Sequence, residues 1–130
     1  MIVLDASALV RYVARVGDDA GWVRAMLGAE RELHAPELVD AETLQGLRGL
    51  VIRGEITPAA ATTAIAELLD SQLLRYPHRP LLERAWSLRG QLTAYDALYV
   101  ALAEALGATL VTTDRRLARV VTTVDVAVPG

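Results

Sequence analysis

Four carboxylates stand where acidic side chains could form one site: Asp5, Glu42, Asp96 and Asp114. Asp5 directly follows a short apolar run at the start of the chain, and Asp114 closely follows a second apolar run over 109–112. Runs of this kind are too short for helices and are typical of buried parallel strands. Ligands bind parallel sheets at the carboxyl ends of the strands, so we expect both acids at that edge.

The residue types in this set predict the chemistry of the site. Four carboxylates converging on one cleft would repel one another unless cations neutralised them. A ligand set without His or Cys favours Mg²⁺ or Mn²⁺ over zinc. Because such ions activate water and hold a phosphodiester for in-line attack, the acids indicate metal-assisted phosphodiester cleavage.

Each acid also has an ordinary structural explanation, which stays open at this point. Asp5 can cap the helix that follows it, and Asp96 can complement its helix dipole from the first turn. Glu42 lies off the apolar stripe of its helix, as a solvated side chain does. Asp114 can be a turn residue before the arginines that follow it. The expectation of a metal site therefore rests on the joint placement of the four acids.

Hydroxyl and guanidinium groups lie near these acids in the sequence. Ser7 and Thr112 each stand two residues from one of them, where a hydroxyl can hold a carboxylate or a metal-bound water. Either hydroxyl can equally cap a helix or fill a strand end. Arg115, Arg116 and Arg11 can bind phosphates bidentately, with a solvated charged face as the alternative.

Glycines and aromatic residues accompany the expected site. Gly46 and Gly49 follow Glu42 at helical spacing, so a backbone or a ligand can approach that side of the helix closely. The aromatic residues are interpreted as core or interface residues before base-stacking platforms: Trp22, Trp86, Tyr95 and Tyr99. His34 and His78 lie far apart and are assigned no role.

The pattern of apolar residues, caps and breakers predicts alternating strands and helices. Strands are expected over residues 1–4, 33–35, 73–76, 109–112 and 124–128. Helices are expected over residues 6–14, 19–29, 37–53, 57–70, 81–89, 93–107 and 116–120, the fourth and sixth counted from their caps Thr57 and Thr93. This alternation predicts a single α/β domain over residues 1–130 with a mostly parallel sheet.

Composition removes several other classes of protein. The 130 residues are 53% hydrophobic and 22% charged, which excludes a disordered chain. Without cysteine there is no disulfide or cysteine-zinc site, and all 13 basic residues are arginine, so lysine chemistry is excluded. The net charge of −3 does not favour nucleic acid, but bound divalent cations would offset it. With no apolar run near 20 residues and no signal-peptide pattern, we expect a cytoplasmic protein without a membrane span.

Four motifs together resemble the PIN-domain family. They are Met-Ile-Val-Leu-Asp-Ala-Ser at 1–7, Ala-Pro-Glu-Leu-Val-Asp-Ala-Glu at 35–42, Leu-Thr-Ala-Tyr-Asp at 92–96 and Leu-Val-Thr-Thr-Asp at 110–114. Each motif alone is weak, but they follow in the family's order over nearly the whole chain. The length is similar to that of the VapC toxins of bacterial toxin–antitoxin pairs.

The resemblance implies a metal-dependent endoribonuclease on a small parallel sheet flanked by helices. It implies one or two Mg²⁺ or Mn²⁺ ions bound by the four acids, with Thr112 and Ser7 in support and arginines near the cleft on the RNA. It also implies a homodimer and a VapB-type antitoxin as partner. Some relatives carry a further acid where this chain has Arg116.

Two kinds of protein are alternatives to a metal-dependent ribonuclease. Receiver domains and haloacid-dehalogenase-type phosphatases use a lysine beside their acids, and this chain has none. A catalytically silent PIN-like module that only binds RNA or a partner stays open, because a sequence does not show turnover.

Overall fold

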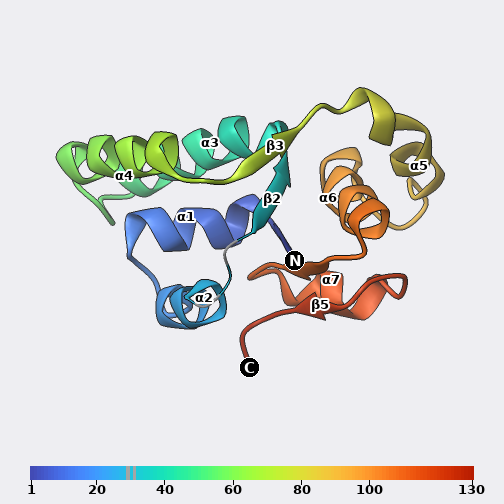
Figure 1. Cartoon of the computed structure of the whole chain (residues 1–130). Coiled ribbons are helices and arrows are strands. Elements are labelled where there is room, and N and C mark those ends of the chain that lie inside the picture. Colours follow the sequence, from blue (N-terminus) through green and yellow to red (C-terminus); the bar gives the residue numbers. More distant parts are fainter. Residues whose placement is uncertain (29, 31) are drawn as a thin grey trace.

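A five-stranded sheet forms the centre of the computed structural model, which describes residues 1–28, 30 and 32–130 (Figure 1). The strands are β1 (Ile2–Leu4), β2 (Leu33–Pro36), β3 (Leu74–Tyr76), β4 (Thr109–Val111) and β5 (Val126–Ala127). Their order is β3-β2-β1-β4-β5, and every pair is parallel. The predicted α/β fold with a parallel sheet is therefore confirmed.

The strand order creates a switch point between β1 and β4. From β1 the chain adds β2 and β3 toward one edge, and then returns to add β4 and β5 toward the other. Connections leave this point in opposite directions, which opens a crevice at the carboxyl ends of the two strands. Leu4 pairs with Val111 at those ends, so the residues that follow them lie next to each other.

Helices cover the sheet in two groups (Figure 1). In Figure 1, α1, α3 and α4 pack together on one side of the sheet, while α5 and α6 lie on the other. The helices are α1 (Ala6–Ala14), α2 (Ala20–Leu27), α3 (Leu38–Ile52), α4 (Pro58–Asp70), α5 (Leu82–Ser87), α6 (Ala94–Leu106) and α7 (Arg115–Val120). Among the described residues, no helix is long and apolar enough to cross a membrane.

The predicted caps of two helices are confirmed. The Thr57 hydroxyl accepts a hydrogen bond from the Ala60 backbone N–H at 3.1 Å, and the Thr93 hydroxyl accepts one from the Asp96 backbone N–H at 3.1 Å. Each satisfies a backbone donor that lacks a partner within its helix. The second cap fixes where α6 begins, and so fixes the position of Asp96 in its first turn.

Three elements differ from their predicted bounds by more than one residue. The predicted helix over 81–89 begins as a 3₁₀ turn, η1 (Arg79–Leu81), and α5 ends at Ser87. Of the predicted strand over 124–128, only β5 is paired. It pairs with β4 alone, because it lies at the edge of the sheet. The predicted helix over 19–29 ends at Leu27, and its last position, residue 29, lies outside the described residues.

Buried apolar side chains hold the two central strands in place. Val3, Leu4, Leu110 and Val111 have no exposed surface. Burying a side chain of this size contributes roughly 1.5–3 kcal/mol. The strand ends that precede the acids are therefore anchored in the buried core.

Gly46 allows α1 and α3 to pack closely, and we expect Gly46→Ala to destabilise the fold. A Cβ atom at this position would lie 2.6 Å from Cγ2 of Val10, which is a stiff side chain in a helix. Overpacking of this kind costs about 1–3 kcal/mol. The free energy of unfolding, measured by urea denaturation, should fall by that amount.

Gly49→Ala is the matched control on the same helix. Its Cβ would lie 3.0 Å from Nη1 of Arg53, the mobile end of a long side chain that can move away. Alanine also favours a helix over glycine by about 1 kcal/mol. Gly49→Ala should be neutral or stabilising, and equal losses in the two variants would contradict the role given to Gly46.

Candidate active site

Asp5 and Thr112 meet because β1 and β4 are neighbours in the sheet. Asp5 follows β1, and its backbone N–H donates a hydrogen bond to the Val111 carbonyl at 3.0 Å, which continues the pairing of the strands. The Thr112 hydroxyl donates to Oδ2 of Asp5 at 2.6 Å. Both side chains are buried. The register of two strands therefore joins residues 107 positions apart in the sequence.

Two hydroxyls fix the orientation of Asp5. The Ser7 hydroxyl donates to the same oxygen, Oδ2, at 2.9 Å and accepts a hydrogen bond from the Thr113 backbone N–H at 3.1 Å. The Thr112 hydroxyl accepts one from the Asp114 backbone N–H at 3.0 Å. The Asp5 side chain makes no capping hydrogen bond to α1. Asp5 therefore stands at the N-cap position of α1, but its carboxylate bonds to the hydroxyls at the sheet edge and not to the helix.

Glu42 projects from α3, and a tyrosine of α6 holds it. The Tyr99 hydroxyl donates a hydrogen bond to Oε1 of Glu42 at 2.7 Å. Burial raises the pKa of Tyr99 far above its usual value, and the neighbouring Glu42 carboxylate raises it further. Tyr99 is therefore a permanent donor to Glu42, although its side chain is also buried in the core as the sequence indicated.

Asp96 and Asp114 share one guanidinium group. Nη2 of Arg116 lies 3.1 Å from Oδ2 of Asp96 and 3.2 Å from Oδ2 of Asp114. Oδ1 of Asp114 accepts a hydrogen bond from the Arg116 backbone N–H at 3.0 Å, so Asp114 also caps α7. The explanation of Asp114 as a local residue before the arginines is thus correct, and Asp114 also belongs to the site.

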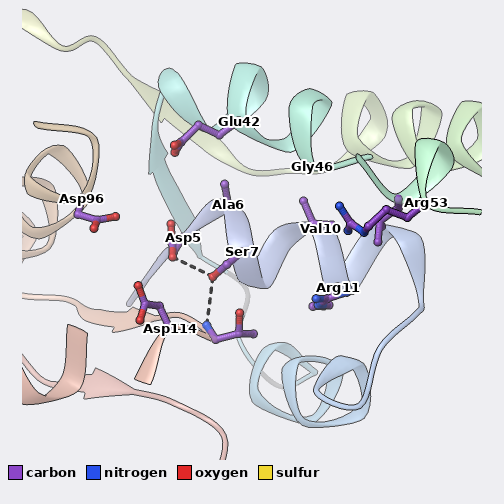
Figure 2. A pocket seen from close by; sticks show the side chains of 12 residues that line it. Asp5, Ala6, Ser7, Val10, Arg11, Glu42, Gly46, Arg53, Asp96 and Asp114 are labelled. Atoms are coloured by element: carbon purple, nitrogen blue, oxygen red, sulfur yellow. Dashed lines mark hydrogen bonds between the residues drawn. The ribbon is translucent and has the colours of Figure 1, made fainter. Parts of the chain in front are cut away.

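One pocket collects all four acids (Figure 2). Figure 2 shows Asp5, Asp96 and Asp114 directed toward one another from three different elements, with Glu42 reaching in from α3. Ser7 and Arg11 also line this pocket. Thr112 and Arg115 are not among the lining residues. Thr112 bonds to Asp5, and Arg115 pairs with Asp19 at 3.6 Å.

The pocket raises the pKa values of three acids, Asp5, Glu42 and Asp96. Burial is the largest cause of the raised pKa for Asp5, Glu42 and Asp96. Mutual repulsion adds to it, from Asp114 on Asp5 and from Asp5 on both Glu42 and Asp96. Hydrogen bonds lower the pKa of Asp5 in part, and Arg116 lowers that of Asp96. The acids are therefore held together against their own charge, as at sites that bind cations.

The donor set fits a hard divalent cation, although the side chains are not gathered around one point. Oxygen-only ligands at a negatively charged pocket suit Mg²⁺ or Mn²⁺. Among the described residues, no three Asp, Glu or His side chains are grouped closely enough to hold a metal ion. Arg116 forms ion pairs with two of these acids, Asp96 and Asp114.

Two arginines line the pocket away from the acids. Figure 2 shows Arg11 of α1 and Arg53 at the end of α3 beyond Val10 and Gly46. Arg11 was predicted from the sequence as a phosphate-binding residue, and Arg53 was not. A signal was present: Arg53 follows Glu42 by eleven residues, about three helical turns, which puts both on one face of α3. The pocket therefore has an acidic end and a basic end.

The fold and the pocket together define a parallel α/β domain with an acidic site at its switch point. A family model described as PIN domain matches residues 2–122. The chain therefore belongs to the PIN domain family.

Curated relatives identify the group within that family. Ribonuclease VapC9 of Mycobacterium tuberculosis is 47% identical over 117 residues, which cover 90% of this chain and 88% of the relative. Ribonuclease VapC3 of the same organism is 45% identical over 118 residues, covering 91% of this chain and 85% of the relative. The predicted resemblance to VapC-type PIN domains is confirmed.

Solved structures share the fold. The crystal structure of VapC20 from Mycobacterium tuberculosis, described as a sarcin–ricin loop cleaving toxin, has a TM-score of 0.72 at 19% identity and covers 96% of this chain and 99% of its own. PAE2754 from Pyrobaculum aerophilum has a TM-score of 0.69 at 28% identity and covers 96% of this chain and 89% of its own. VapBC2 from Rickettsia felis, solved bound to a DNA fragment from its promoter, has a TM-score of 0.64 at 18% identity, with 98% of both chains covered.

Proposed function

We propose that the chain is the toxin of a type II toxin–antitoxin pair and acts as an endoribonuclease that requires Mg²⁺ or Mn²⁺. The relatives named as ribonucleases match about nine tenths of its length. The observation that carries the proposal is the pocket at the switch point, which four carboxylates line. The proposed reaction is hydrolysis of RNA phosphodiester bonds.

The proposed ligands of one or two divalent ions are Asp5, Glu42, Asp96 and Asp114. When bound, such an ion lowers the pKa of water and stabilises negative charge on a phosphodiester. The protein's own contribution is to hold the carboxylates ready at neutral pH. Ser7 and Thr112 orient Asp5, and Tyr99 orients Glu42.

Thr112→Val should slow RNA cleavage by about 10–100-fold. This is the range found when a group that orients a metal ligand is removed. Valine has nearly the same shape as threonine, but it neither donates to Asp5 nor accepts from the Asp114 backbone N–H. Single-turnover cleavage of a labelled RNA would measure the loss.

Thr112→Ser is the matched variant, because it keeps the hydroxyl and removes only a methyl group. It should retain most of the rate. A Thr112→Ser variant as slow as Thr112→Val would show that the methyl group, rather than the hydroxyl, matters at this position.

The basic end of the pocket is proposed to hold the RNA backbone. Arg11 and Arg53 line it, and a guanidinium group binds phosphate oxygens bidentately. Arg115 of α7 is a further candidate, whereas Arg116 of the same helix pairs with two of the acids. Single-stranded loops are the expected targets, because their bases can be splayed out and contacted.

The proposed partners are those of VapC toxins: a VapB-type antitoxin and a second copy of the chain. VapBC2 from Rickettsia felis, whose fold is similar, was solved as a toxin–antitoxin complex on promoter DNA. The proposed place of action is the cytoplasm, where the RNA substrate is found.

Incubating the purified chain with RNA in Mg²⁺ or in EDTA tests the proposal. Cleavage in Mg²⁺ that EDTA abolishes is the expected result. A PIN-like module that only binds RNA or a partner would shift the RNA on a native gel and leave the strand whole with either addition. That outcome would overturn the proposed enzymatic activity.

A further inference from the structure

Arg116 places a positive charge of the protein's own beside two acids of the site. Its guanidinium lies within hydrogen-bonding distance of two of the four acids, Asp96 and Asp114, through a single nitrogen, Nη2. Its backbone N–H bonds to Asp114 as well, so α7 begins at a fixed distance from that acid. The guanidinium therefore contacts two carboxylates at one side of the site, and the backbone hydrogen bond fixes the residue that carries it.

The four acids divide into two pairs by their contacts. Asp5 and Glu42 are oriented by neutral hydroxyl donors, which leave their negative charge uncompensated. Asp96 and Asp114 are neutralised in part by Arg116. A cation entering the pocket therefore finds the largest unpaired negative charge on the side of Asp5 and Glu42, with Asp96 facing them.

A second divalent ion would compete directly with the guanidinium. An ion bound between Asp96 and Asp114 would approach the same oxygens that Nη2 contacts, so its double positive charge and the charge of the guanidinium would repel each other there. One divalent ion and one guanidinium already bring three positive charges to four carboxylates. The side chain of Arg116 is 55% exposed.

We propose that Arg116 takes the place of a second metal ion, so that the site binds a single divalent cation per chain. This inference rests on the proposed function, since it describes the same metal site. It assigns a charge-supplying and positioning role to a residue that stands where some members of the family have a further acid.

Isothermal titration of the metal-free chain with Mn²⁺ alone tests this inference. The wild type should bind one ion per chain. Arg116→Asp, which frees Asp96 and Asp114 and adds a carboxylate, should bind two. Arg119→Asp is the control: Arg119 is an exposed residue of the same helix, with no ion pair among the described residues, and the substitution changes the charge equally. It should bind one ion.

The outcomes separate the inference from the proposed function. Two ions in the wild type, one ion in Arg116→Asp, or two ions in both variants would overturn the role of Arg116. Electron paramagnetic resonance of the Mn²⁺-saturated wild type gives a result that depends on no variant: an isolated ion supports the inference, and a magnetically coupled pair contradicts it. Wild-type RNA cleavage with two ions bound would refute the inference alone, whereas neither binding nor cleavage would refute the proposed function as well.

Discussion

Asp5→Asn should lower the rate of Mg²⁺-dependent RNA cleavage by about a thousandfold or more, while the fold remains intact. Asp5 lies at the switch point between β1 and β4, and two hydroxyl groups fix its orientation. Losing a ligand that places a divalent ion removes several kcal/mol of transition-state stabilisation, and about 4 kcal/mol corresponds to a thousandfold. Single-turnover kinetics on a labelled RNA would measure it.

Asparagine at position 5 keeps the shape and one acceptor oxygen, so Ser7 and Thr112 still have a partner. The circular dichroism spectrum should match that of the wild type. Asp70→Asn is the matched control, because Asp70 is exposed at the end of α4 and does not line the pocket. It should cleave at the wild-type rate. Full activity in Asp5→Asn would contradict the proposed role of Asp5.

Asp96→Asn should abolish cleavage to a similar degree and yet make the metal-free protein more stable. Burial raises the pKa of Asp96, and the charges of Asp5 and Asp114 raise it further against the opposing effect of Arg116. Folding therefore favours protonated Asp96 over the charged form. Asparagine resembles the protonated acid, so the variant avoids the penalty of holding this charge, and its melting temperature in EDTA should be a few degrees higher.

The pH dependence of this gain follows from the sign of the shift. The folded state binds the Asp96 proton more tightly than the unfolded state, whose pKa is near the ordinary value of 3.8. Stability from this group is therefore fully present below that value and is lost as pH rises through the raised pKa. Asp96→Asn and wild type should melt alike at low pH and diverge toward neutral pH.

Added Mg²⁺ should reverse the order of stability. The ion stabilises the wild type, because it binds the folded state alone, and it should stabilise Asp96→Asn much less. Thermal melts at neutral pH, with EDTA or with Mg²⁺, measure both effects. A variant that is less stable than the wild type in EDTA would show that Asp96 serves mainly as a structural residue of α6.

The sequence was sufficient to predict the parts of the site that depend on local patterns. Asp5 and Asp114 could be placed at strand ends because short apolar runs in an alternating chain indicate parallel strands. Thr93 predicted where α6 begins, and so the position of Asp96 on the first turn. These inferences need only neighbouring residues and the rule that ligands bind at the carboxyl edge.

Contacts between distant elements could not be predicted in the same way. Tyr99 was interpreted as a core residue, and its hydrogen bond to Glu42 joins α6 to α3, which cover opposite sides of the sheet. Gly46 was expected to admit a backbone or a ligand, and it is Val10 of α1 that approaches it. Arg116 was expected to contact phosphate, whereas in the structure it pairs with two of the acids. Each of these depends on side-chain packing, which no single segment specifies.

The central claim is that the acids of this pocket hold a divalent ion for hydrolysis of RNA by water. The most direct measurement follows cleavage of an end-labelled RNA by the metal-free chain as Mg²⁺ is added, and then analyses the new ends. We predict no cleavage in EDTA, a rate that rises with Mg²⁺ to saturation, and linear phosphate ends from attack by water. Cleavage that persists in EDTA, or 2′,3′-cyclic phosphate ends from attack by the neighbouring hydroxyl, would contradict it.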